Sequence, residues 1–83
     1  MKQHQSHAGI SKRLKRAEGH LRSTIQMIES GRPCLDLAQQ LHAVESAISN
    51  AKKELIHDHM EHCLDSMEPK RALKEMRALA KYI

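Results

Sequence analysis

The sequence predicts an all-α protein built around one long central helix. Between Pro33 and about Ser66, apolar residues recur at alternating steps of four and three positions, which is the spacing of one helix face. Shorter stretches with the same period lie on either side, and Gly31 and Pro69 mark the breaks between them. These observations predict a chain of three helices.

The first helix is expected to begin between Ala8 and Ser11 and to end near Gly31, since glycine suits the position after a helix end. Residues 1–9 are polar and carry His4 and His7, so we expect a flexible tail followed by a single domain over residues 10–83. The stripe expected to be buried consists of Ile10, Leu14, Ala17, Leu21, Ile25 and Ile28.

The opposite side of this first helix is strongly basic. Its cationic residues are Lys12, Arg13, Lys15, Arg16 and Arg22. Glu18 is the single acidic residue between positions 10 and 22, so neighbouring carboxylates are too few to pair these charges. We therefore interpret this side as a surface that contacts phosphates.

The central helix carries metal-ligand residues at both ends of its apolar stripe. That stripe consists of Leu37, Leu41, Val44, Ile48, Ala51 and Leu55. Cys34 precedes it by three positions, and His59 and Cys63 continue it at steps of four. Because His59 and Cys63 are four residues apart, they share a helix face and can bind one ion.

Cys34 cannot reach His59 within one straight helix, because 25 residues at about 1.5 Å each separate them by roughly 37 Å. An antiparallel partner helix would bring Cys34 of one chain to His59 and Cys63 of the other. Two-fold symmetry then makes two identical sites in each homodimer.

A thiolate, imidazole and thiolate set favours Cu(I), which accepts three ligands and prefers sulfur. Ni(II), Co(II) or Zn(II) would need a fourth ligand, which His4 or His7 could supply. A thiol sensor that forms a disulfide or polysulfide between Cys34 and Cys63 of two chains is a further alternative, as is a metal-storage protein that never binds DNA.

The third helix is expected from Pro69 to Ala80, with Leu73, Met76, Ala80 and Ile83 along its apolar stripe. Met27, Met60, Met67 and Met76 are scattered at core-like spacings and do not form a cluster, so we interpret them as packing residues rather than copper ligands.

Composition limits the class of protein. The 83 residues carry a net charge of +4 and one aromatic residue, Tyr82, which disfavours base-stacking modules for single strands and leaves double-stranded DNA as the expected partner. No stretch has the length of a membrane span or the pattern of a signal peptide, so we expect a cytoplasmic protein without a membrane partner. No nucleophile, nucleotide-binding or metalloprotease motif is present, so we expect neither an enzyme nor a small-molecule substrate.

The chain resembles the copper-sensing operon repressor (CsoR) family of bacterial regulators, which also includes nickel/cobalt, formaldehyde and persulfide sensors. The resemblance covers about residues 10–82 and rests on the motifs RLKR, GHL and MIE, followed by C-x-D, Q-x-x-AV and H-x-x-x-C. It implies a three-helix protomer, antiparallel dimers and a dimer-of-dimers tetramer. It also implies that metal-free protein binds operator DNA without a helix-turn-helix and that effector binding releases it.

By the same resemblance, Cys34, His59 and Cys63 fall on the family's copper ligands, and Glu75 on a glutamate linked to the ligand histidine. Pro33 stands where copper sensors commonly carry a tyrosine. The DNA-binding surface of the family maps most clearly onto Arg13, with Lys15 and Arg16 beside it. In the central helix, Asn50 occupies a position that is often basic in the family, and Lys52 and Lys53 keep positive charge nearby.

Overall fold

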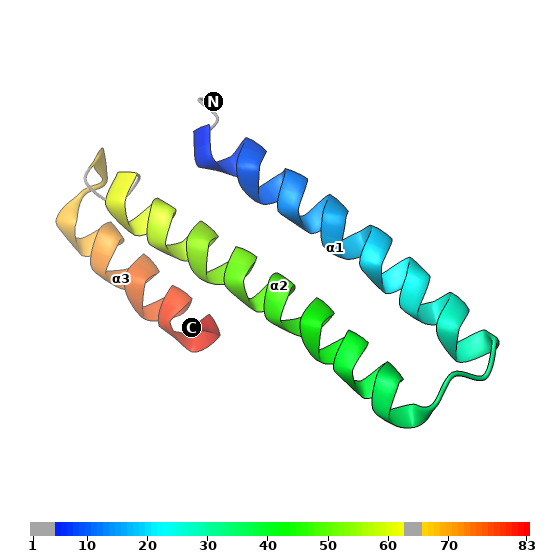
Figure 1. The fold of residues 1–83 in the computed structure, drawn as a ribbon. Helices are drawn as coiled ribbons and strands as arrows, with labels where there is room; N and C mark the ends of the chain where they lie inside the picture. Colours follow the sequence, from blue (N-terminus) through cyan, green and yellow to red (C-terminus); the bar gives the residue numbers. More distant parts are fainter. Residues whose placement is uncertain (1–4, 63–65) are drawn as a thin grey trace.

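The computed structural model describes residues 5–62 and 66–83, and every regular element within those ranges is helical. The elements are α1 (Gln5–Glu29), α2 (Cys34–His62), α3 (Pro69–Leu79) and the short 3-10 helix η2 (Ala80–Tyr82). Figure 1 shows α1 and α2 running antiparallel along their length, with α3 folded back beside the C-terminal half of α2. The predicted all-α class and the three helices are confirmed.

The turn between α1 and α2 is fixed by a glycine. Gly31 has φ of 79°, in the left-handed region that glycine adopts without steric cost. Its N–H donates to the carbonyl of Ile28, and the N–H of Arg32 donates to the carbonyl of Met27, both at 3.1 Å. This pair of hydrogen bonds is the Schellman motif that ends many helices.

The expected start of the first helix, between Ala8 and Ser11, is too late. α1 begins at Gln5, so part of the segment that the sequence predicts as a tail is helical. The added turn brings His7 Nε2 to 3.7 Å from Asp58 Oδ2 on α2. The local sequence pattern does not predict this tertiary contact. The central helix is described as far as His62. Residues 63–65, which precede its predicted end near Ser66, lie outside the described residues.

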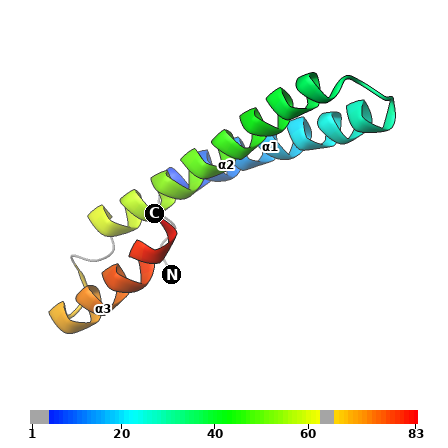
Figure 2. The same cartoon turned by 90° about the horizontal axis from the view of Figure 1, so that it is seen from below.

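The chain forms a thin slab. Its principal extents are 54 × 24 × 13 Å, and the shortest is close to the diameter of about 10–12 Å of a single helix. In Figure 2, α1 and α2 overlap in a narrow band from which α3 diverges. The radius of gyration is 17.0 Å, whereas a compact domain of this length has about 12 Å. The accessible surface of 6848 Å² also exceeds the roughly 5,000 Å² of a typical folded monomer of this mass.

Only part of each predicted stripe is buried within the chain. The buried positions of α1 and α2 are Ile10, Ala17 and Thr24, and Val44, Ala51, Ile56 and Asp58. Thr24 is fully buried, and its hydroxyl donates to the carbonyl of His20 at 2.9 Å, which satisfies the polar group. The expectation that the entire stripes are buried is therefore wrong for a single chain.

Of the remaining apolar residues of the stripes, Leu37 is half-buried and the others are exposed by 39–48%. They are Leu14, Leu21, Ile25 and Ile28 in α1 and Leu41, Ile48 and Leu55 in α2. In α3 no residue is buried, and Leu73 and Met76 of its stripe are exposed. A stable domain buries its apolar faces between at least two packed layers of secondary structure. This chain forms a single layer of helices, so apolar residues on its faces remain exposed to solvent. No helix in the described segments is both long and apolar enough to cross a bilayer.

Candidate metal centre and DNA-binding surface

His59 and Glu75 form the centre of the candidate metal site. His59 lies near the C-terminal end of α2, and Glu75 reaches it from α3, with side chains 26% and 33% exposed. His59 Nε2 is hydrogen-bonded to Glu75 Oε1. An ionised carboxylate only accepts, so Nε2 carries the hydrogen, and in the neutral ring Nδ1 then keeps a lone pair for a metal ion. The glutamate that the resemblance implied thus contacts the histidine.

Cys34 lies at the far end of the same helix. α2 is continuous from Cys34 to His62, so the two candidate ligands are held apart by the whole helix length. The Cys34 thiol is free and exposed. Cys63, the third predicted ligand, lies outside the described residues, as does His4. Within the described ranges of one chain, no three His, Cys, Asp or Glu side chains gather in a way that could hold a metal.

Cys34 also begins an exposed row on α2. Leu41, Ile48 and Leu55 follow it at steps of seven residues, which is close to two helical turns, so the four side chains line up along one side. His59 follows Leu55 by four positions and continues that side. An apolar row that has candidate ligands at both ends is thereby open to a partner.

A cavity of about 230 Å³ adjoins His59. It is lined by His7, Leu55, Ile56, His59, Glu75 and Leu79, so all three helices meet there. The structure therefore brings the described tail histidine, His7, to the same cavity as His59. Asp58, which approaches His7, was not among the predicted site residues. Its spacing of seven from Ala51 and fourteen from Val44 placed it on the buried row and could have singled it out.

The basic side chains predicted to contact phosphate are all exposed. They are Lys12, Arg13, Lys15, Arg16, Arg22, Lys52 and Lys53. Acidic partners are scarce within residues 10–22, but Arg13 finds one on another helix, because its guanidinium forms an ion pair with Glu54 of α2. Arg22 lies 3.7 Å from Glu18, one turn away in α1.

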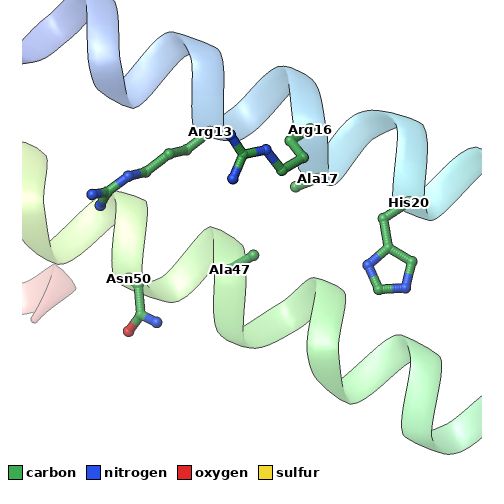
Figure 3. A pocket seen from close by; sticks show the side chains of 6 residues that line it. All are labelled: Arg13, Arg16, Ala17, His20, Ala47 and Asn50. Carbon is green, nitrogen blue, oxygen red and sulfur yellow. The ribbon is translucent and has the colours of Figure 1, made fainter.

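A groove of about 270 Å³ separates α1 from α2 beside these charges. Arg13, Arg16, Ala17 and His20 line it from α1, and Ala47 and Asn50 from α2 (Figure 3). Figure 3 shows Arg13 extending across to α2. His20 Nε2 lies 2.6 Å from Gln40 Oε1, a second polar link between the helices. This arrangement offers cationic and amide donors on one side of the slab.

Comparison with characterised proteins places these features in a family. Residues 6–83 match the family described as metal-sensitive transcriptional repressor. The chain is 43% identical over 54 residues to the copper-sensing transcriptional repressor CsoR of Mycobacterium ulcerans, covering 65% of this chain and 46% of the relative. It is 42% identical over 55 residues to the protein of the same name from Bacillus subtilis, covering 66% of this chain and 54% of the relative.

The copper-sensing transcriptional repressor RicR of Mycobacterium tuberculosis is 39% identical over 54 residues, covering 65% of this chain and 56% of the relative. The matched part of the chain thus spans about half the length of these curated relatives. No solved structure matches the chain significantly. The matched family consists of transcriptional repressors rather than enzymes, as the sequence predicts. Because the family match covers almost every residue, this chain belongs to the metal-sensitive transcriptional repressors.

Proposed function

We propose that this protein is a copper-responsive repressor, which binds operator DNA when metal-free and releases it when Cu(I) binds between two subunits. The observation that carries the proposal is the position of Cys34 and His59 at opposite ends of one continuous helix, joined by an exposed apolar row. A site that uses both residues requires a second chain. The copper-sensing relatives support the choice of metal.

The second chain is a copy of the first, packed antiparallel on the exposed row of α2. In a two-fold pair, the axis crosses the helix at the midpoint of any two positions that meet. The midpoint of positions 34 and 59 falls at residues 46–47, and that of positions 34 and 63 at residues 48–49. The axis therefore crosses α2 beside Ala47 and Ile48, and Ile48 is one of the exposed residues of the row.

The donor set fits the proposed effector. Cys34 of one chain, with His59 and Cys63 of the partner subunit, provides two soft sulfur ligands and one imidazole, the combination that Cu(I) prefers. Glu75 holds the His59 ring so that Nδ1 is the ligand atom. Bound by these three residues, Cu(I) would supply a link between the two subunits.

Release of DNA follows from the position of the basic residues. Their helix, α1, packs along α2, the helix that carries ligands at both ends. A small rotation of one α2 against its partner would carry the two α1 surfaces out of register with the phosphates. A coupling of about 1–3 kcal/mol is typical of such a switch. Dimers pair into the tetramer implied by the resemblance, and the protein acts in the cytoplasm, where operator DNA lies.

The experiment is an anaerobic Cu(I) titration of reduced protein against a strong chelator, while release of a labelled duplex from upstream of its own gene is followed. We expect one tight equivalent per chain, DNA release at that stoichiometry, and loss of both in Cys34→Ser. Tight copper binding with DNA retained would contradict the repressor mechanism. Failure of the metal-free protein to bind any duplex would favour a storage protein.

A second candidate is a Ni(II), Co(II) or Zn(II) sensor, favoured by the shared cavity of His7 and His59. His7 is then the fourth ligand, beside the three proposed for copper. His7→Ala separates the two: Cu(I) affinity should stay unchanged, whereas affinity for Ni(II) or Co(II) should collapse if this candidate is right. DNA release by polysulfide without metal, with a Cys34–Cys63 crosslink in mass spectra, would instead identify a thiol sensor.

A further inference from the structure

Within the described residues, Arg13 is the one predicted DNA-contacting residue that forms an ion pair with a different helix. Its guanidinium pairs with the carboxylate of Glu54, which lies 41 positions along the chain on α2. Arg22 has an acidic neighbour within its own helix, at the longer distance of 3.7 Å. In the described part of the chain, no ion pair involves Lys12, Lys15, Arg16, Lys52 or Lys53.

The pair stands at the edge of the groove between α1 and α2. Arg13 lines that groove together with Arg16 and Asn50, and Figure 3 shows its side chain drawn across to α2 and away from Arg16. The carboxylate of Glu54 thus neutralises one of two guanidinium groups at the groove. It also adds a negative charge to the side that would face a DNA backbone.

The exposure of the pair makes it open to competition. The side chain of Arg13 is 59% exposed and that of Glu54 is 39% exposed. Ion pairs in contact with water contribute little to stability, because water and salt screen them and because ordering two long side chains costs entropy. A phosphate, which accepts the same two parallel N–H bonds from arginine as a carboxylate does, can therefore displace Glu54.

We infer that Glu54 is an internal competitor of DNA for Arg13, and that it sets how tightly the metal-free protein binds duplex. The pair must open before Arg13 reaches a phosphate, and the released carboxylate then repels the backbone. This inference rests on the DNA binding proposed above, and it assigns a role to a residue of α2 that carries the wrong charge for DNA.

The test is Glu54→Gln, which keeps the size of the side chain and removes its charge. Binding to a labelled mixed-sequence duplex is measured by fluorescence anisotropy over a range of salt concentrations, because phosphate contacts do not depend on sequence. We expect affinity to rise about two- to fivefold. The slope of log affinity against log salt should steepen by up to about 0.9, the value for one phosphate contact, in proportion to how far Glu54 keeps Arg13 from the DNA in the wild type.

Two controls separate competition from a general change of charge. Glu45→Gln removes a carboxylate on the same helix, nine positions away and thus on its opposite side, and should leave affinity within about twofold of wild type. In an Arg13→Ala background, Glu54→Gln should no longer increase affinity. Thermal unfolding of each variant shows whether packing has changed.

Equal gains from Glu54→Gln with and without Arg13 would overturn the inference, because the effect would then be long-range electrostatics alone. Unchanged or weaker binding by Glu54→Gln would overturn it in favour of a purely structural pair. Either result leaves the proposed repressor function standing, whereas absence of duplex binding by the wild type would remove both.

Discussion

The side chain of His59 shows how one residue can serve both fold and site. Its Nε2 is bound to Glu75 of α3, so the same hydrogen bond ties α3 to α2 and leaves Nδ1 available as a ligand atom. His57, two positions earlier, forms a comparable contact with Glu61 at 3.0 Å, but that pair lies within one helix and is more exposed. Two His–Glu pairs that begin within one turn of α2 thus have different proposed roles.

Replacement of Glu75 by alanine should weaken metal binding. Without its carboxylate, the ring of His59 is free to rotate and its tautomer is no longer fixed, so we expect Cu(I) affinity to fall about 10- to 100-fold. Chelator competition measures the change, and binding of duplex by the metal-free variant should persist. Glu61→Ala is the matched control and should leave Cu(I) affinity unaltered. Equal losses in the two variants would argue against a specific role for Glu75.

At the scale of the helices, the turn at Gly31 sets how α2 pairs with α1. The left-handed φ of Gly31 closes α1 through two hydrogen bonds and directs the chain into Pro33 and Cys34. A Cβ added at Gly31 would meet no atom within 4 Å, so any cost of substitution comes from the backbone conformation alone. A substitution at Gly31 therefore measures the energetic cost of its left-handed φ angle without a contribution from steric clashes.

We expect Gly31→Ala to lower the free energy of unfolding by about 1–2 kcal/mol, the cost of a left-handed conformation for an L-residue. Gly19→Ala is the matched comparison, because Gly19 lies inside α1 and a Cβ there also meets no atom within 4 Å. That change should stabilise by up to about 1 kcal/mol. Urea denaturation at one fixed protein concentration measures both, and a stabilising effect of Gly31→Ala would contradict the analysis of the turn.

The helices were predictable from sequence because their signals are local. The period of the apolar residues, Gly31 and Pro69 indicated three helices, and all three were found. The early start of α1 and the pairing of Arg13 with Glu54 were not predictable, since both depend on contacts between residues far apart in the chain. The sequence also did not predict which residues of each stripe are buried within the chain, because periodicity identifies an apolar face but not the partner that covers it.

At the scale of the whole molecule, one chain alone neither covers its apolar faces nor assembles the proposed metal site. It is 13 Å thick in its shortest dimension and leaves a row of apolar residues open on α2. Cys34 and His59 lie at opposite ends of α2 and cannot bind one ion within this chain. A second copy packed on that row would complete the helical layers and the metal site at once, which is why packing and sensing belong to the same proposal.

Ile48→Glu should disrupt the proposed dimer, because it places a charge beside the two-fold axis, where it would also meet its own copy. We expect the variant to sediment as a monomer at concentrations where the wild type is associated, with much reduced helicity. Leu35→Glu is the control, since Leu35 is more exposed than Ile48 and lies off the row. If both variants associate like the wild type, the row is not the interface.

The central claim, that each site is shared by two chains, is tested most directly by mixing two variants. Cys34→Ser and Cys63→Ser are each expected to lose tight Cu(I) binding. When the two are unfolded and refolded together, random pairing makes half of the dimers mixed, and each mixed dimer has one intact site. Chelator competition should then recover about one quarter of the wild-type number of tight sites per chain. A mixture that binds no more copper than the separate variants would contradict a site shared between subunits.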